Sequence, residues 1–341
     1  MIMARPVRID VENGWYHVMS RGIERRDIFG DDRDRGHFLD LLADTTERYN
    51  VGVHAFVLMD NHYHLLLQTP EANASRAMQW LNVSYASWFN ARRSRVGHLF
   101  QGRFKSTLID GNGSWLLLAS VYIHLNPVNL AGLALSKTES AAEARGFRDP
   151  TKEQVVERLK KLRTFRWSSY RAYGRYAGTP EWLRCTELLH RAGGREAYRR
   201  YVQQHVTRGM DPDTFSSFGE SVAIGKTEFL DRARSIAKGL TREHCRRDFL
   251  KDRPGLDNII AAVEQVKGED WKEFRGRYGD SGRDVVFYLA KMRCGLTYAE
   301  LGSAAGEVEA GTVAQSVFRL KHRLKKDKLL ASLVKQCIAQ M

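Results

Sequence analysis

The sequence has no long apolar run and few cysteines. No stretch of about 18 apolar residues, enough to cross a membrane, occurs in its 341 residues, and no apolar segment of the signal-peptide kind follows the start. The cysteines are scattered, and their spacing suits neither a metal site nor a disulfide framework: Cys185, Cys245, Cys294 and Cys337. These absences predict a protein of the reducing cytoplasm that is neither exported nor bound to a membrane.

Acidic residues are too few to balance the basic ones. The chain has 54 Lys and Arg residues against 40 Asp and Glu, which gives a net charge of +14 and a pI of about 9.7. Such an excess favours a polyanionic partner, of which nucleic acid is the commonest, although a basic protein can also lack such a partner. We therefore expect a cytoplasmic protein associated with the nucleoid. The length predicts two or three domains.

The first 135 residues alternate between strand and helix patterns. Apolar runs predict strands, and apolar positions at helical spacing predict helices. The strands are expected at 14–21, 51–59, 62–68 and near 104–109, and the helices at 33–49, 74–92 and 114–125. This order predicts an α+β domain in which an antiparallel sheet is covered by helices on one face.

The rest of the chain is mainly helical in pattern. Residues 136–165 are charged and alanine-rich, which predicts a helical insert between the first domain, residues 1–135, and a helical extension over residues 166–240. A group of charges near 241–254 indicates a second boundary. We expect residues 241–341 to form a separate, entirely helical domain.

Two histidines flank a tyrosine directly after a predicted turn, in the segment Asp60-Asn61-His62-Tyr63-His64. Residues at i and i+2 of a strand share one face, so His62 and His64 lie together and Tyr63 points to the other face. Two neighbouring imidazoles are half of a divalent-metal site. The alternative is two ordinary histidines, one held by hydrogen bonds and one at the surface.

Tyr122 and Asn126 lie one helical turn apart, just before Pro127. If their helix packs under the histidine strand, a phenol, a carboxamide oxygen and two imidazoles converge. Two histidines and an asparagine then supply three neutral ligands to a cation whose open positions hold phosphate oxygens. Tyr122 would be the nucleophile, and nearby cations must stabilise its phenolate because a free phenol has a pKa of about 10. The alternative is a core tyrosine and a helix-ending asparagine.

Four blocks of sequence, two of which contain the histidine pair and the Tyr122–Asn126 pair, follow one another along the chain. They are Tyr16–Gly22 (YHVMSRG), Leu58–Leu67 (LMDNHYHLLL), Gly97–Phe104 (GHLFQGRF) and Tyr122–Val128 (YIHLNPV), and Trp167–Tyr170 (WSSY) comes after them. Together the four blocks closely resemble the single-tyrosine HUH transposases. The last block resembles the branch of REP-associated tyrosine transposases. The resemblance covers roughly residues 14–235.

This resemblance implies a ferredoxin-like catalytic domain that acts on single-stranded DNA near REP-like hairpins, as a monomer or homodimer. It implies that His62 and His64 bind a divalent metal ion, Mg²⁺ or Mn²⁺, with Asn126 as third ligand. Tyr122 then attacks the scissile phosphate to give a 5′-phosphotyrosine and a free 3′-hydroxyl, which can rejoin strands. Two alternatives stay open: a non-catalytic DNA-binding regulator, and a metal-dependent nuclease that uses activated water.

Basic residues gather around the block that contains Phe100 and Phe104. Arg92 and Arg93 precede it. Cations with interleaved aromatic rings suit contact with a DNA backbone and stacking of its bases, although a solvated positive loop beside a core strand has the same pattern. The candidate DNA-binding residues of this half are Arg21, Arg95, His98, Arg103 and Lys105.

A helix-turn-helix is expected near the C-terminus. Leu296–Gly302 and Gly311–Leu320 resemble its two helices, as in the C-terminal DNA-binding domain of the replication initiator DnaA. The second helix would contact duplex DNA and turn three apolar residues inward: Thr312, Gln315, Ser316 and Arg319 face the DNA, and Val313, Val317 and Leu320 face the core. The alternative is a helical accessory module with a solvated basic face.

Overall fold

The computed structural model describes residues 8–129, 143, 148–208, 218, 221–239, 254–277, 280–294, 296, 298–324 and 326–341. Contacts divide the chain into two compact units, residues 1–225 with 232–249 and residues 226–231 with 250–341. Helix α10 (Thr227–Gly239) spans this division. The predicted boundary at 241–254 and the start of the predicted insert at 136–165 lie almost wholly outside the described residues.

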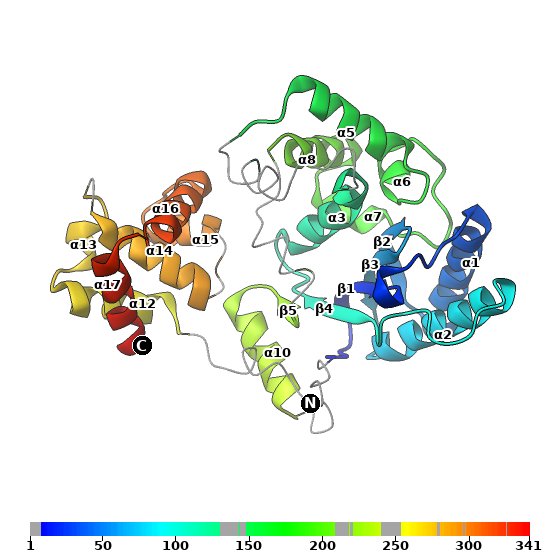
Figure 1. The fold of residues 1–341 in the computed structure, drawn as a ribbon, viewed down its shortest axis with the longest axis horizontal. Coiled ribbons are helices and arrows are strands. Elements are labelled where there is room, and N and C mark those ends of the chain that lie inside the picture. The colour runs from blue at the N-terminus through cyan, green and yellow to red at the C-terminus, as the bar shows by residue number, and fades with distance from the viewer. Residues whose placement is uncertain are drawn as a thin grey trace. The chain divides into compact units, whose positions relative to one another are not determined.

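The first unit is built on a sheet of strand order β2-β3-β1-β4-β5 (Figure 1). Its first four strands are antiparallel to their neighbours, and the order β-α-β-β-α-β along the chain makes this part ferredoxin-like. The bounds follow the sequence prediction closely: β1 Gly14–Arg21, α1 Asp32–Tyr49, β2 Gly52–Met59, β3 His62–Thr69, α2 Ala74–Arg92 and β4 Lys105–Ile109. The short β5 (Ala223–Ile224) pairs parallel to β4, and it lies in the extension, which was expected to be helical.

Helices α1 and α2 pack against each other on one face of this sheet. Asp31 caps the start of α1 by accepting a hydrogen bond from the Asp34 amide, and Arg92 and Arg93 at the end of α2 pair with both carboxylates. Tyr63 lies in the core on this face, where its hydroxyl donates to Asn82 Oδ1 at 2.6 Å. The prediction that Tyr63 points away from its flanking histidines is therefore confirmed.

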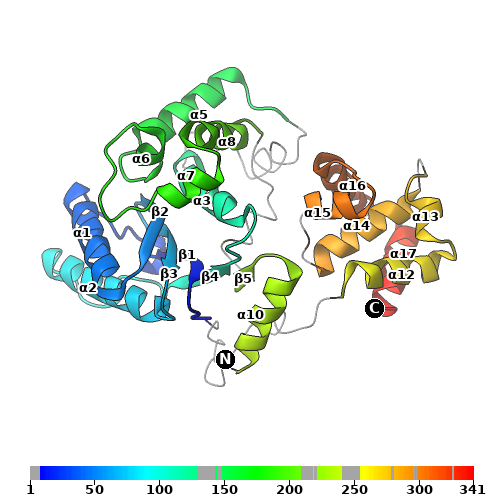
Figure 2. The same cartoon turned by 180° about the vertical axis from the view of Figure 1, so that it is seen from behind.

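Helix α3 (Trp115–Leu125) packs against β2 and β3 on the histidine face. Figures 1 and 2 show the strands between α3 and the pair α1 and α2. The expectation of helices on one face holds for α1 and α2 and is corrected by α3. The reason is visible in its composition: a helix that is apolar all round must be covered on every side. Helices α7 (Thr186–Arg191) and α8 (Arg195–Arg208) supply that cover.

The Trp167–Tyr170 block attaches the extension to the edge strand β2. The Leu58 amide donates to the Trp167 carbonyl at 2.9 Å, and the Ser169 amide donates to the Phe56 carbonyl at 3.0 Å. These bonds cover backbone groups that an edge strand otherwise leaves open.

Ser169 also connects the extension to α3. Its hydroxyl accepts from the Phe56 amide at 2.8 Å and lies 2.7 Å from Nε2 of His124, a buried residue of α3. The other ring nitrogen of His124 lies 2.7 Å from the Tyr198 hydroxyl on α8. Strand β2, helix α3 and helix α8 are therefore joined through one buried histidine.

The second unit is helical throughout its described residues. Its helices are α12 Leu256–Lys267, α13 Trp271–Phe274, α14 Ser281–Arg293, α15 Tyr298–Ala304, α16 Ala310–Arg323 and α17 Lys328–Ala339. Val313, Val317 and Leu320 of α16 lie in its core, as the sequence predicts. A Cβ on Gly302 would lie 1.9 Å from the Val308 carbonyl oxygen, so only glycine fits between α15 and α16. Among the described helices of either unit, none has both the length and the hydropathy needed to span a bilayer.

Candidate active site

Strands β1 and β3 place four polar side chains on the face that α3 covers. Arg21 is the register partner of His62, and Met19 is the partner of His64. The rings of His62 and His64 lie 5.0 Å apart between centroids, and His17 of β1 lies 5.0 Å from His64. The alternation of strand side chains accounts for this arrangement, because all of these positions share one face.

Helix α3 brings the tyrosine and the asparagine to the same place. The Tyr122 ring meets the ring of His64 edge-on at 5.4 Å and that of His17 at 5.1 Å. Asn126 lies beside His62, and its side chain influences the pKa of that ring. Its Nδ2 donates to the Tyr122 carbonyl at 2.9 Å, so Oδ1 is the atom left to face His62. The structure thus brings together the residues that the sequence singles out as nucleophile and metal ligands.

His17 determines which nitrogen of His64 is available. His17 Nδ1 lies 2.7 Å from the Phe218 carbonyl oxygen, which can only accept, so this nitrogen carries the proton. Nε2 of the neutral ring is then an acceptor, and it lies 2.8 Å from Nδ1 of His64, which must donate. The lone pair of His64 is therefore on Nε2. A backbone carbonyl sets the tautomer of a candidate ligand through a second histidine.

His62 is held in the same way by a different partner. Its Nδ1 donates to Asn61 Oδ1 at 2.6 Å, and Asn61 Nδ2 donates to the Arg25 carbonyl at 3.0 Å, which identifies the oxygen. Both imidazoles therefore present Nε2, and with Asn126 Oδ1 they form a neutral donor set that fits a divalent cation with open positions. The described residues contain no group of three or more His, Cys, Asp or Glu suited to a metal.

Burial keeps these imidazoles neutral. It lowers the pKa of His17 and of His62 to about 4, with the Arg21 cation adding to the effect at His62. Burial also lowers the pKa of His64 well below its ordinary value, assisted by the neighbouring histidines. Neutral imidazole is the form that binds metals, so the site is in its ligand form at neutral pH.

The environment of Tyr122 has opposing effects on its hydroxyl. Burial raises the pKa of Tyr122 to about 12, and the Arg21 cation acts in the opposite direction. The free protein therefore holds a phenol at neutral pH. Arg21 is the residue that already favours the phenolate.

Phe218 covers the tyrosine. Its ring stacks on that of Tyr122 at 5.2 Å with 30° between the planes, and Tyr122 is only 7% exposed. The Phe218 carbonyl accepts from His17 and, at 3.3 Å, from Thr107 Oγ1. The Phe218 ring is therefore part of the cover over Tyr122. Sequence reasoning did not single out Phe218 or assign a role to His17. The only signal for His17 was its place in the Tyr16–Gly22 block.

Comparison with known families bears on the same segment. Residues 10–126, which include His17, both histidines of β3, Tyr122 and Asn126, match the family model described as "Transposase IS200 like". This segment is therefore similar to the IS200-like transposases. A solved structure of a REP-associated tyrosine transposase bound to a REP hairpin is similar at 14% identity and a TM-score of 0.37, over 52% of this chain and 89% of that chain. No curated protein matches the sequence.

The basic block of the first unit is only partly as predicted. His98, Arg103 and Lys105 are exposed and Arg95 is half-buried. Phe100 and Phe104 are 8% and 6% exposed, so they belong to the core and are not free to stack on bases, which corrects that expectation. Arg92 and Arg93 likewise serve α1 through their ion pairs.

The predicted recognition helix of the second unit corresponds to α16. Thr312, Gln315 and Arg319 are exposed along it. Ser316 is fully buried, and its hydroxyl accepts from Arg319 at 3.3 Å. Ser316 therefore packs inside the unit and does not face DNA, which corrects its assignment. Helical periodicity accounts for this, since position 316 lies one turn from Val313 and Leu320 on the core side.

Proposed function

We propose that the protein is a metal-dependent transposase that cleaves and rejoins single-stranded DNA near hairpin elements through a 5′-phosphotyrosine on Tyr122. The observation that carries this proposal is the convergence of two Nε2 lone pairs, Asn126 Oδ1, a buried phenol and the Arg21 cation. A non-catalytic DNA-binding protein has no need of this combination.

In this mechanism His62, His64 and Asn126 hold Mg²⁺ or Mn²⁺, which polarises the scissile phosphate when bound. Tyr122 Oη forms a bond to phosphorus while the bond from phosphorus to the 3′ oxygen breaks. The phenol gives up a proton and the departing 3′ oxygen gains one. Arg21 stabilises the phenolate, and His17 is a positioning residue that keeps the His64 proton away from Nε2. In the reverse direction, a 3′-hydroxyl attacks the phosphotyrosine and restores the phenol.

The proposed DNA contacts lie outside this centre. The exposed side chains His98, Arg103 and Lys105 and the half-buried Arg95 would hold the phosphate backbone. In the second unit the exposed face of α16, with Thr312, Gln315 and Arg319, would contact duplex DNA. The Trp167–Tyr170 block supports a REP-like hairpin as the substrate.

The test is to trap a covalent adduct. Wild-type protein is incubated with Mn²⁺ and a single-stranded hairpin that is labelled at either its 5′ or its 3′ end. A 5′-phosphotyrosine joins the protein to the fragment downstream of the cleavage site, so only the 3′ label should run with the protein on denaturing gels. Tyr122→Phe, which removes one oxygen, should lose adduct and cleavage together, and His62→Ala should lose both while still binding DNA. Equal cleavage by Tyr122→Phe and wild type would refute the nucleophile assignment.

Other outcomes would favour the rival functions. Cleavage without an adduct in the wild type would indicate a nuclease that uses activated water. Tight hairpin binding without cleavage at any metal concentration would indicate a regulator.

A further inference from the structure

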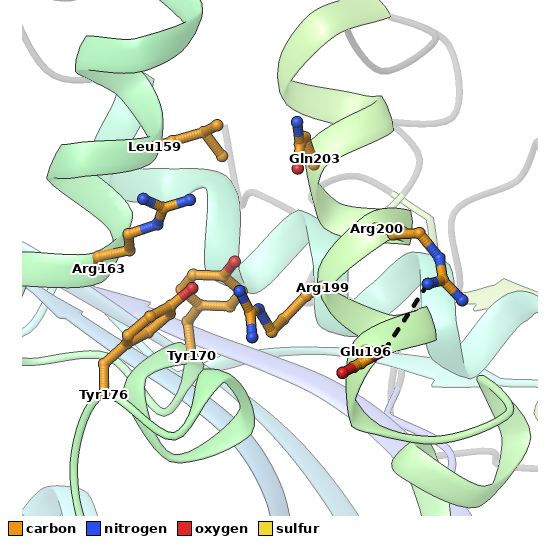
Figure 3. Close-up of a pocket in the computed structure, with 8 residues that line it drawn as sticks. All are labelled: Leu159, Arg163, Tyr170, Tyr176, Glu196, Arg199, Arg200 and Gln203. Carbon is orange, nitrogen blue, oxygen red and sulfur yellow. Dashed lines mark ion pairs between the residues drawn. The ribbon is translucent and has the colours of Figure 1, made fainter.

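A second candidate site lies in the helical extension of the first unit. Helices α5 (Lys152–Thr164), α6 (Tyr170–Gly174) and α8 pack against one another around a pocket of about 210 Å³ (Figure 3). Its lining combines three arginines, two tyrosines and one carboxylate: Leu159, Arg163, Tyr170, Tyr176, Glu196, Arg199, Arg200 and Gln203. None of these residues takes part in the catalytic centre.

Two of the arginines lie near the same aromatic ring. The guanidinium carbon of Arg163 is 5.8 Å from the centroid of the Tyr176 ring, and that of Arg199 is 5.7 Å from the same centroid. In Figure 3 the Arg199 guanidinium lies beside the tyrosine rings, and Arg163 projects from α5 into the space above them. Within the part of the chain that the structure describes, no carboxylate lies within 4.0 Å of either guanidinium. Two cations that share a ring and lack a carboxylate attract an anion.

The other charges of the pocket leave this pair available. Arg200 points away from the rings in Figure 3, toward Glu196, its partner at 4.0 Å. Glu196 is thereby the carboxylate of Arg200, one turn along α8. The net positive charge of the lining is therefore concentrated on Arg163 and Arg199.

The position of Tyr176 is built into the backbone. A Cβ on Gly174 would lie 2.1 Å from Cε2 of Tyr176, so the ring lies directly across a residue that must be glycine. Arg175 adopts a left-handed conformation at φ 59°, which turns the chain back at this point. The Tyr176 amide donates to the Arg171 carbonyl at 2.7 Å, and the Arg171 guanidinium donates to the Tyr176 carbonyl at 3.1 Å. An aromatic ring held this firmly, and only partly buried, is a surface on which a planar group can stack.

The pocket is also rigidly connected to the catalytic helix. Tyr198 precedes Arg199 on α8, and its hydroxyl donates to Ser120 Oγ at 2.8 Å and lies 2.7 Å from His124 Nδ1. Both of these partners belong to α3, which carries Tyr122. A ligand in the pocket is thus held on the same buried framework as the proposed nucleophile.

We propose that this pocket binds one nucleotide of single-stranded DNA, with its phosphate between Arg163 and Arg199 and its unpaired base on Tyr176. Guanidinium groups suit phosphate, and stacking on an aromatic ring requires a base that is not paired. The volume lies below the roughly 300–1,000 Å³ of sites for free small ligands, which fits one unit of a longer chain better than a separate cofactor. This proposal rests on the proposed function, since it assumes a single-stranded DNA substrate.

The test compares matched charge-removing variants by fluorescence anisotropy with a labelled single-stranded hairpin flank. The double variant Arg163→Gln, Arg199→Gln should bind about tenfold more weakly at low salt. Its slope of log K against log salt should fall by about 0.7, the loss of one phosphate contact on a single strand. Arg200→Gln removes a charge from the same pocket and should leave affinity and slope close to wild type. Equal behaviour of the double variant and Arg200→Gln would overturn the proposal.

The base contact needs a different pair of measurements. Tyr176→Leu should weaken binding of the single strand by at least about fivefold with an unchanged salt slope, and should leave binding of a fully paired duplex unchanged. An equal loss on both probes would overturn the stacking assignment. If the proposed function is wrong, wild-type protein will form no adduct with the hairpin. If only the pocket proposal is wrong, every pocket variant will form the adduct and bind the single strand as wild type does.

Discussion

The hydrogen-bond chain from the Phe218 carbonyl through His17 to His64 leads to a sharp prediction about metal affinity. Replacing His17 with phenylalanine keeps a ring of similar size and removes the acceptor of the His64 Nδ1 proton. His64 is only 2% exposed, so water cannot take over as acceptor. A buried donor without a partner costs about 1–3 kcal/mol.

His64 can avoid that cost by moving its proton to Nε2, but Nε2 is then no longer a ligand. The penalty therefore falls on metal binding. At 1.4 kcal/mol for each factor of ten it corresponds to roughly 5- to 150-fold. Partners of metal-binding histidines generally contribute about 10- to 100-fold. We expect the dissociation constant for Mn²⁺ to rise about 10- to 100-fold in His17→Phe.

Two amide variants separate the contacts of His17. In His17→Gln the amide oxygen reaches the place of Nε2 and can accept from His64, whereas the shorter amide of His17→Asn reaches only the Phe218 carbonyl. Mn²⁺ binding in the absence of DNA can be followed by electron paramagnetic resonance of the free ion. The affinity for Mn²⁺ should be highest in wild type, lower in His17→Gln, and lowest and similar in His17→Asn and His17→Phe. Long-range ¹H–¹⁵N spectra should show the His64 Nδ1 proton in wild type and in Gln.

Wild-type affinity in His17→Phe, with cooperative urea unfolding intact, would refute this reasoning. A Gln variant no better than Asn would show that the His64 contact is not the cause.

Two further predictions concern stability. The histidines of the unfolded chain are protonated near pH 6.5, whereas folded His17 and His62 have a pKa of about 4. The free energy of unfolding should therefore fall as pH drops from about 6.5 to 4, by up to about 3 kcal/mol for each residue. Urea unfolding across this range checks it, and His17→Phe should show a smaller pH dependence; an unchanged one would contradict the assignment. Ser169→Ala removes the hydroxyl between Phe56 and His124 and should lower the unfolding free energy by about 1–3 kcal/mol, whereas exposed Thr164→Ala should change it by less than about 0.5 kcal/mol.

Local pattern accounts for most of the ferredoxin-like domain. Strand and helix periodicity predicted its elements to within a few residues, because both periods are properties of the chain itself. The same reasoning placed His62 and His64 on one face, turned Tyr63 away from them, and put Tyr122 and Asn126 one turn apart. Each of these relations spans no more than four residues.

The sequence pattern did not predict which side chains are buried by other elements of the fold. Phe100 and Phe104 lie beside basic residues in the sequence, yet both are buried, and Phe100 packs against Tyr63 of β3 and Tyr85 of α2. Ser316 shares its helix with exposed polar residues, yet it lies on the core side. Both errors came from treating polarity in the sequence as exposure. Exposure depends on which element packs against the side chain, which local periodicity does not report.

The sequence by itself therefore determined the order of elements, the histidine pair and the tyrosine one turn before its asparagine. Only the tertiary structure decided that α3 packs on the histidine face and that His17 directs the proton of His64 from 47 residues away. It also placed Phe218 over Tyr122, 201 residues from the histidine that binds its carbonyl. The physical reason is that a hydrogen bond or a ring contact between distant segments depends on how the whole sheet and its helices pack, and no local period encodes that packing.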